Sequence, residues 1–207
     1  MAFPSLTEIE PGRRSRKKNK TRSDLMAAGA KLFATRGFDE TTTVEIADLA
    51  DVSQRTLFRH FPTKESLLYG DMEDLRVELR KNLSRRPMEE SILASVREAL
   101  IPLDKDFEDQ REHRLLQAQL AARYPSVSAY SRAVVQASWE REIIAAVSMR
   151  LGVDPMVDPR PEIVAGASMS AIRIATRQWT ASAGSADYIE LLSAALGAIG
   201  SIHELDL

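Results

Sequence analysis

The sequence predicts an all-α protein of about nine helices, arranged as an N-terminal three-helix head with a helix-turn-helix and a C-terminal helical bundle. Apolar residues recur every three or four positions along almost the whole chain, and alternating strand-like runs are missing. Pro and Gly residues interrupt this spacing at intervals that suit helices of ordinary length. A chain of 207 residues can hold a small domain of about 60 residues and a larger second one.

The first predicted helix begins near Thr21 and ends before Gly37, because glycine readily adopts the left-handed conformation that terminates a helix. The apolar spacing gives this helix one face that we expect to be buried. That face carries Leu25, Ala28, Leu32 and Phe33.

Two short helices are predicted next. Thr42 and Glu45 have the spacing of a capping box, so the second helix begins there and runs to about Ala50. After a short turn, the third helix covers residues 54–60, because Pro62 prevents its continuation.

The remaining breakers define the rest of the bundle. Thr63 is a suitable N-cap for a long fourth helix that reaches about Arg85 and is closed by Pro87. Five further helices are predicted over residues 88–101, 108–123, 125–151, 160–183 and 187–204.

The composition, with 44% hydrophobic and 28% charged residues, is that of an ordinary globular protein. No apolar stretch approaches the roughly 20 residues of a membrane helix, and the N-terminus lacks the apolar core of a signal peptide, so we expect a cytoplasmic protein without membrane contact. The chain has no cysteine, and His60, His113 and His203 are far apart. We therefore expect no metal site and predict no cofactor.

The basic residues are concentrated at the front of the chain. Residues 1–64 contain 12 Lys and Arg against 8 Asp and Glu, whereas the rest contains 16 against 22. Seven of the positive charges lie within residues 13–22, with no acid among them. Such a block can be a solvated, disordered tail. It can also be an arm that follows a phosphate backbone or enters a minor groove, which its position before a helix-turn-helix favours.

Residues 43–62 fit the frame of a helix-turn-helix. Ile46 and Ala47 face inward on the first helix, Val52 fills the turn, and Leu57 packs the second helix against the first. The outer face of the second helix is then free to enter a major groove, although many helix pairs of this geometry bind no DNA. This outer face comprises Gln54, Arg55, Thr56, Phe58, Arg59 and His60.

The segments Thr42–Ala47 and Val52–Glu65 strongly resemble the TetR family of repressors, and Leu32–Phe33 with Gly37–Phe38 belongs to the same signature. The resemblance is specific over residues 21–70 and weaker, but consistent in helix layout, afterwards. It implies that the DNA contacts are Thr42, Thr43, Gln54, Arg55, Thr56, Phe58, Arg59, His60 and Lys64.

The chemistry of these side chains separates their roles. Arg55 and Gln54 are expected to read bases, because a guanidinium pairs with guanine and an amide with adenine, each worth about 1–3 kcal/mol of discrimination. The alternative to a DNA contact for His60 is packing within the protein at the end of the helix. Contacts to phosphates, sugars or a thymine methyl are expected from Thr43, Phe58, His60 and Lys64.

Asp51 departs from the family pattern, which usually has glycine at this turn position. Aspartate tolerates the left-handed conformation less well than glycine, so we expect a turn that is slightly strained or differently closed.

The resemblance also implies a homodimer in which the last two helices of each copy form a four-helix bundle. Twofold symmetry then predicts a pseudo-palindromic operator. Each candidate interface residue could instead belong to the core of one chain. The candidates are Ala165, Ser168, Ile172, Thr176, Leu191, Ala195, Ala198 and Ile202.

Segments of the C-terminal half, 112–116, 124–125, 139–140, 151–155 and 177–179, resemble a TetR subgroup associated with acyl-CoA-like ligands. This implies a long apolar slot for a small-molecule effector, with an arginine near its polar head, although ordinary core packing is the alternative for every lining residue. The candidates are Leu79, Leu100, Arg114, Leu120, Tyr130, Val134, Met169 and Arg173.

These observations predict a homodimeric, ligand-responsive repressor of double-stranded DNA with a basic disordered arm at 1–20, a DNA-binding domain at 21–66 and a ligand-binding and dimerisation domain at 67–207. An activator of the same family and a helical adaptor for protein partners are the alternatives. An enzyme is not expected, because the chain has no Gly-rich phosphate loop, nucleophile elbow or paired-histidine motif.

Overall fold

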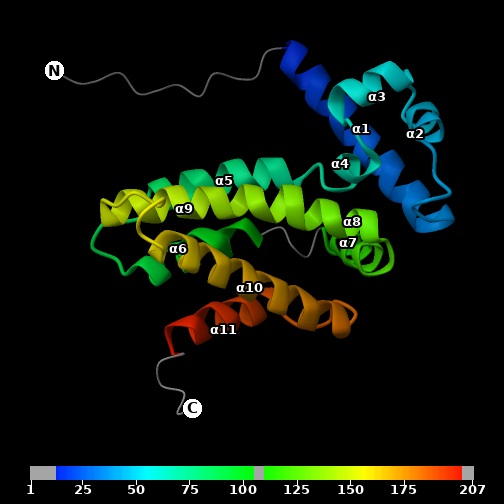
Figure 1. The fold of residues 1–207 in the computed structure, drawn as a ribbon. Coiled ribbons are helices and arrows are strands. Elements are labelled where there is room, and N and C mark those ends of the chain that lie inside the picture. Colours follow the sequence, from blue (N-terminus) through cyan, green and yellow to red (C-terminus); the bar gives the residue numbers. More distant parts are fainter. Residues whose placement is uncertain (1–12, 105–109, 202–207) are drawn as a thin grey trace. The chain divides into compact units, whose positions relative to one another are not determined.

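A computed structural model describes residues 13–104 and 110–201, with side chains over 16–103 and 110–201. Within these ranges every regular element is a helix, so the all-α prediction is confirmed. No helix in the described ranges is long and apolar enough to span a membrane. The chain divides into two compact units, Met1–Leu68 and Tyr69–Leu207 (Figure 1).

The first unit is the predicted three-helix head with one additional short helix. Its core contains Leu25, Phe33, Ile46 and Leu57, each no more than 2% exposed. The long first helix packs on the second and the fourth, and the second packs on the third. The four helices are α1 (Arg13–Arg36), α2 (Thr43–Leu49), α3 (Gln54–His60) and α4 (Lys64–Leu68).

The predicted start of the first helix near Thr21 is wrong, because α1 begins at Arg13. The basic residues 16–20 lie on exposed helical turns and not on an extended arm, so the predicted boundary at residue 20 falls inside a helix. Lys20 pairs with Asp24 one turn later at 2.9 Å. The buried second half of α1 anchors the helix, and exposed like charges cost too little to unwind its first turns.

The ends of the short helices are formed as predicted. Thr42 and Glu45 make the full capping box, with the Glu45 amide donating to Thr42 Oγ1 and the Thr42 amide donating to Glu45 Oε2 at 2.9 Å. The Ser53 hydroxyl caps α3 by accepting from the Thr56 amide. Asp51 has the left-handed φ of 51° that its turn position predicts.

The predicted long fourth helix is wrong, because it is broken after Leu68. A turn in which the Met72 amide donates to the Tyr69 carbonyl separates α4 from α5 (Met72–Ser84). Gly70 lies in this turn, and a glycine inside a helix costs about 1 kcal/mol relative to alanine. The continuous apolar spacing concealed this break.

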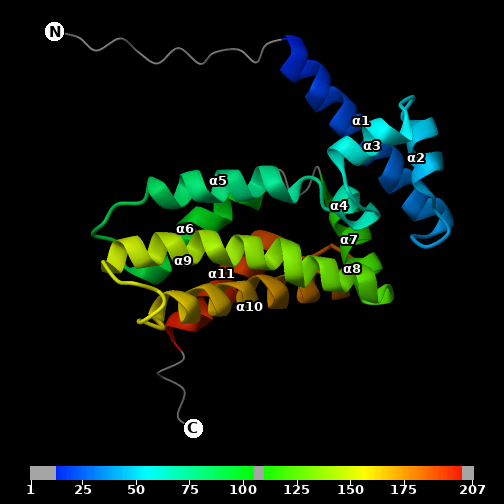
Figure 2. The ribbon, with the colours of Figure 1, turned by 45° about the horizontal axis from the view of Figure 1, so that its top comes forward.

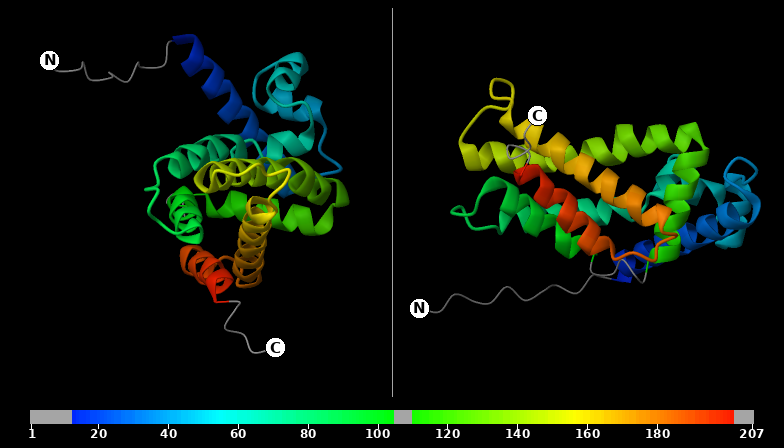
Figure 3. Two further views of the ribbon diagram at one scale, coloured as in Figure 1. Left: turned by 60° about the vertical axis from the view of Figure 1, so that its left-hand side comes forward. Right: turned by 90° about the horizontal axis from the view of Figure 1, so that it is seen from below.

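The second unit is a helical bundle whose first helix is α5. In it α5 runs beside α9, while α10 packs mainly on α11 and α9 (Figures 1 and 2). Figure 3 shows α10 and α11 side by side when the molecule is seen from below. Trp179, 0% exposed, is the largest fully buried side chain of its core. Its other elements are α6 (Ile92–Leu100), a 3₁₀ turn η1 (Ile101–Asp104), α7 (Arg111–Arg123), α8 (Pro125–Tyr130), a π-helix η2 (Ser131–Gln136), α9 (Ala137–Leu151), α10 (Arg160–Ala181) and α11 (Tyr188–Gly200).

Candidate nucleic-acid interface and ligand pocket

The outward face of α3 is a polar and aromatic surface. Leu57 is 1% exposed and fixes α3 against Ile46 and Ala47 of α2, which are also buried. This leaves Arg55 and Phe58 on the exposed side, with Phe58 45% exposed although it is a large apolar side chain. A single exposed apolar ring is common on protein surfaces, so the character of this face comes from its exposed cations, Arg55 and Arg59, which suit a nucleic-acid surface.

The first turns of α2 and α3 are tied together by a side-chain hydrogen bond. Gln54 Nε2 donates to Thr43 Oγ1 at 2.9 Å, so the Gln54 amide has a defined orientation. Thr42 is exposed, but its hydroxyl accepts from the Glu45 amide and also lies 2.9 Å from Glu45 Oε2. Its hydroxyl is therefore committed to the capping box.

Cations from α1 and α3 gather around His60. Burial lowers the pKa of His60, and the charges of Arg59, Lys18 and Arg22 lower it further. Arg22 also stacks over the Phe61 ring, with 4.7 Å from Cζ to the ring centroid. The half-buried imidazole is therefore held neutral in a positive environment that an anion would stabilise.

Lys64 lies at the start of α4, and its ammonium group is directed into the first unit. Lys64 Nζ donates to the carbonyls of Phe38 at 2.7 Å and Thr41 at 3.0 Å, and lies over the Phe38 ring at 4.7 Å. A third carbonyl, that of Asp39, is 3.4 Å away. These contacts order the loop that leads into α2.

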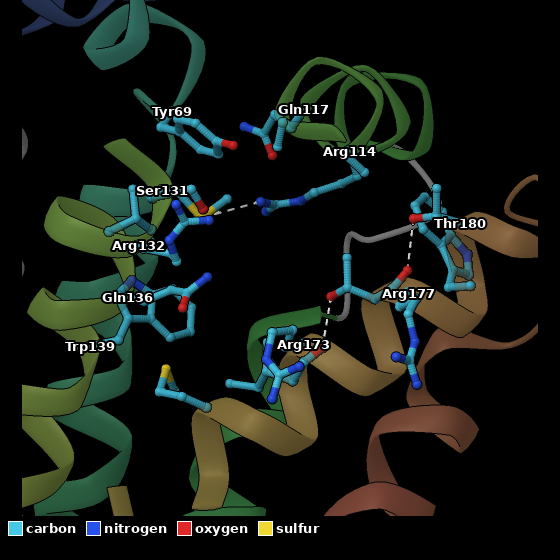
Figure 4. A pocket seen from close by; sticks show the side chains of 18 of the residues that line it. Tyr69, Arg114, Gln117, Ser131, Arg132, Gln136, Trp139, Arg173, Arg177 and Thr180 are labelled. Carbon is cyan, nitrogen blue, oxygen red and sulfur yellow. Dashed lines mark hydrogen bonds between the residues drawn. The ribbon is translucent and has the colours of Figure 1, made fainter. Parts of the chain in front are cut away.

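The second unit contains a cavity of about 660 Å³ that is partly open to solvent, a volume typical of small-molecule sites (Figure 4). Tyr69, Arg114 and Gln117 border one side, and Gln136 and Trp139 border another. The apolar walls come from α5, α6, α9, α10 and α11, and include Met72, Leu75, Leu100, Met169, Ile172 and Leu192.

The charged side chains of the cavity lining are cationic. Among the described residues, its lining contains arginines but no Asp or Glu. Trp139 Nε1 is buried without a hydrogen-bond partner, and an unsatisfied buried donor costs about 1–3 kcal/mol. A bound acceptor would remove this cost. The lining arginines are Arg114, Arg132, Arg173 and Arg177.

One wall of the cavity is a π-helix. Ser131, Arg132, Val135 and Gln136 of η2 all line the cavity, and η2 joins α8 and α9 into one continuous run. Single π-turns inside longer helices occur frequently at functional sites. The four residues form two adjacent pairs one helical turn apart and so lie on one side of the helix.

The structure brings together half of the predicted effector residues. Leu100, Arg114, Met169 and Arg173 line the cavity. The other four do not line it: Leu79 and Leu120 are buried elsewhere, Val134 is 45% exposed, and Tyr130 stacks on Tyr69.

The sequence reasoning missed most of the polar lining. Apolar spacing selects core residues such as Leu79, and it gives no weight to polar side chains on the same inward face. Gln117, 5% exposed and one turn after Arg114, could have been found as a polar residue at a core position. The other missed polar or aromatic lining residues include Tyr69, Ser131, Arg132, Gln136, Trp139 and Arg177.

The predicted interface residues also separate into classes. Ala165 and Ser168 are buried within the unit, and Ile172 and Thr176 line the cavity. Leu191 and Ala195 are half-buried, Ala198 is exposed, and Ile202 lies outside the described residues. Further small or apolar residues exposed on α10 and α11 are Ile163, Gly166, Ala194 and Gly197.

Comparisons with known proteins match both units. The family described as "Bacterial regulatory proteins, tetR family" matches residues 25–69, and the family "MftR C-terminal domain" matches residues 90–203. The chain is 29% identical over 177 residues to the HTH-type transcriptional regulator TcmR of Streptomyces glaucescens, covering 82% of this chain and 77% of TcmR. It is 25% identical over 186 residues to MftR of Mycobacterium tuberculosis, covering 90% and 92% of the two chains.

Solved structures share the fold. FadR of Thermus thermophilus, a TetR family transcriptional repressor in complex with lauroyl-CoA, superposes with a TM-score of 0.56 at 23% identity, over 90% of this chain and 96% of FadR. The fatty acid degradation regulator FadR of Bacillus halodurans superposes with a TM-score of 0.61 at 13% identity, over 92% of this chain and 96% of that FadR.

Proposed function

Because the chain belongs to the TetR family of bacterial transcription regulators, which are not enzymes, we propose that it is a homodimeric repressor whose operator binding is controlled by a small apolar or acyl-type effector. We also propose that it acts in the cytoplasm, where bacterial DNA lies. The observation that carries the DNA-binding part is the face of α3, where Leu57 is buried while Arg55 and Phe58 are exposed. Such a helix can enter a major groove with its first turns against base edges.

We propose different roles for the cationic side chains of this surface. Arg55 is exposed and reads a base, because its guanidinium can pair with both acceptors of a guanine. Arg59 and the basic turns of α1 contact phosphates, which strengthens binding without reading sequence. Lys64 supports the α1–α2 loop through its carbonyl contacts and so positions Thr42 and Thr43. Thr56 and His60 complete the surface.

The experiment that tests DNA binding is selection of bound sequences from a random duplex pool. The expected result is an enriched inverted repeat, with the purified chain binding it at least roughly 1,000-fold more tightly than random duplex at the same salt concentration. Arg55→Ala is expected to relax the preference at one base pair of each half-site, at a cost of about 1–3 kcal/mol. Lys31→Ala, which removes an exposed charge from the same head, serves as the control. Binding without any sequence preference would contradict the proposal.

The cavity supports the effector part of the proposal. Its apolar walls can hold a hydrocarbon chain, and its arginines and the Trp139 donor can hold a polar or anionic head. The related fold of Thermus thermophilus FadR was solved with lauroyl-CoA, which makes that compound the first to test. An effector acts only through a difference in affinity for the two states of the repressor.

The expected result is that lauroyl-CoA lowers the affinity for the selected operator. A short-chain ester such as acetyl-CoA, which shares the head group but lacks the chain, is expected to have much less effect. If neither lauroyl-CoA nor a broader set of apolar metabolites changes operator affinity, control by an acyl-type effector is excluded while DNA binding stands.

A further inference from the structure

Asp71 occupies the N-cap position of α5 without capping it. Its side chain makes no hydrogen bond to the first turn of α5. Aspartate is among the best N-cap residues, so another interaction must hold the carboxylate away from the helix. The helices α2, α3, α6 and α11 all have the cap that α5 lacks, from Thr42, Ser53, Ser91 and Asp187.

The interaction that holds Asp71 comes from α7. Arg114 Nη1 lies 3.1 Å from Asp71 Oδ2, Gln117 Nε2 donates to Oδ1 at 3.1 Å, and His113 Nε2 is 3.7 Å from Oδ1. The side chains of Asp71 and Arg114 are only 15% and 12% exposed. Burial acts to raise the pKa of Asp71, but His113, Arg114 and Gln117 lower it further than burial raises it, so the carboxyl group is ionised.

Two members of this cluster also line the cavity. Arg114 and Gln117 reach into the cavity from α7, as Figure 4 shows. The pair with Asp71 is close but not well aligned, since Asp71 Oδ2 is buried without a hydrogen bond of acceptable geometry. A ligand with an acidic group in the cavity can therefore offer Arg114 a better-aligned partner.

The backbone of Asp71 shows what its release would change. Its ψ is −24°, whereas the capping residues Thr42, Ser53, Ser91 and Asp187 have ψ between 112° and 154°. An Asp71 that caps α5 therefore has to rotate into the extended region. Asp71 follows the last residue of the first unit, Leu68, by three positions, so the rotation changes the backbone close to the boundary between the two units.

We propose that Asp71 and Arg114 form a latch that an anionic effector opens: the acidic group of the effector binds Arg114 and Gln117, and the displaced Asp71 carboxylate caps α5. This inference rests on the proposed ligand-responsive function and assigns its ligand an acidic group. It also supplies the two discrete arrangements that a ligand-controlled transition requires.

The competition is tested with two probes of equal chain length, laurate and the uncharged 1-dodecanol. Binding to the full chain is followed by tryptophan fluorescence, since Trp139 and Trp179 line the cavity. Asp71→Asn removes the competing charge, so laurate is expected to bind about tenfold more tightly to this variant than to the unsubstituted protein. Dodecanol affinity is expected to change less than about twofold.

The matched control is Asp74→Asn, which removes the same charge from an exposed position one turn along α5. It is expected to leave both affinities unchanged. Equal laurate affinity for the unsubstituted protein and Asp71→Asn would overturn the proposal, and so would a failure of laurate to bind either protein.

The cap is tested by hydrogen exchange at the Asp74 amide, which an N-cap at Asp71 would bond. Saturating laurate is expected to slow this exchange about fivefold in the unsubstituted protein and not at all in Asp71→Ala. Arg114→Gln is expected to slow it without laurate, whereas Arg123→Gln, an exposed arginine of the same helix, leaves it unchanged. Unaltered exchange in both the laurate complex and Arg114→Gln would exclude the cap exchange.

Both measurements use the protein without DNA, so they separate the two proposals. A lack of sequence-specific DNA binding would contradict the proposed function but would not affect the laurate-binding and hydrogen-exchange results. The opposite outcome is also possible to distinguish. If lauroyl-CoA releases the selected operator but Asp71→Asn binds laurate as the unsubstituted protein does, the proposed repressor function stands and the proposed latch is excluded.

Discussion

The proposed DNA contact of His60 predicts that operator binding depends on pH. In the free protein its burial and the neighbouring charges of Arg59, Lys18 and Arg22 keep its pKa below the ordinary value of about 6.5. A DNA phosphate against the imidazole favours the charged form and raises the pKa of His60 in the complex. Operator binding then takes up a proton, so operator affinity is expected to rise as the pH falls from 7.5 to about 5.5.

His60→Gln is expected to remove most of this pH dependence, as measured by operator titrations at constant ionic strength. The pH dependence of the free energy of unfolding has the opposite sign. Because the folded-state pKa of His60 is depressed, its neutral form supports folding above the unfolded-state pKa, and this support is lost as the pH falls toward the folded-state value. Parallel affinity slopes for the unsubstituted protein and His60→Gln would show that no phosphate lies against this side chain.

The residues of the recognition surface were predictable to different extents. The exposed face of α3 follows from one buried residue, Leu57, because the helical period then fixes which side chains point outward. The position of Lys64 could not be predicted, since its partners are carbonyls about 25 residues earlier in the chain. Sequence spacing contains no information about such a tertiary contact.

At the scale of helices, Gly29 fixes how closely α1 approaches α4. A Cβ atom added to Gly29 would lie 2.1 Å from Leu67 Cδ2, and Leu67 is itself buried. Gly29→Ala should gain about 1 kcal/mol from helix propensity, but the overlap with Leu67 is expected to outweigh this gain. We expect a net loss of about 1–3 kcal/mol in the free energy of unfolding, measured by urea denaturation.

Gly200→Ala is the matched control for this prediction. The added Cβ would meet only Leu93 Cδ1 at 4.0 Å, an ordinary contact, so stability should be unchanged or slightly higher. A Gly29→Ala protein as stable as this control would show that α1 and α4 separate easily.

Helix types and centres were predictable, but some boundaries were not. The predicted helix over 125–151 is one continuous run in the structure, made of α8, η2 and α9, but periodicity gave no sign of the π-turn in its middle. The break at residues 69–71 was missed because an apolar pattern can continue in phase across a turn. The early start of α1 was not predicted, because a helix that is anchored at its other end tolerates the repulsion between the basic residues of its first turns.

At the scale of the whole molecule, the lining of the cavity could be predicted from the sequence only in part. Arg114 and Met169 were predicted as lining residues and do line the cavity, but Leu79 and Leu120 share their inward spacing and pack into solid core. Whether an inward side chain meets a neighbour or a void depends on how several helices cross. No single helix period determines that.

The proposed dimer gives a prediction at this scale. Gly197 is exposed on α11, and a Cβ atom added to it would meet nothing within 4 Å, so a larger side chain leaves the fold of one chain intact. Gly197→Arg is expected to place a charge in the proposed contact between two copies and to yield monomers by sedimentation analysis. Because each monomer then binds a single half-site, operator affinity should fall roughly 100-fold or more.

Ala145→Arg is the matched control, because it adds the same side chain to an exposed position of α9 away from this face. It is expected to remain dimeric and to bind the operator normally. Ser168→Arg is expected to unfold the bundle, since Ser168 is 0% exposed and its hydroxyl donates to the Val164 carbonyl at 2.7 Å. If Gly197→Arg remains dimeric with full operator affinity, the dimer interface lies on another surface, and the exposed residues of α10 and α11 face solvent in the dimer.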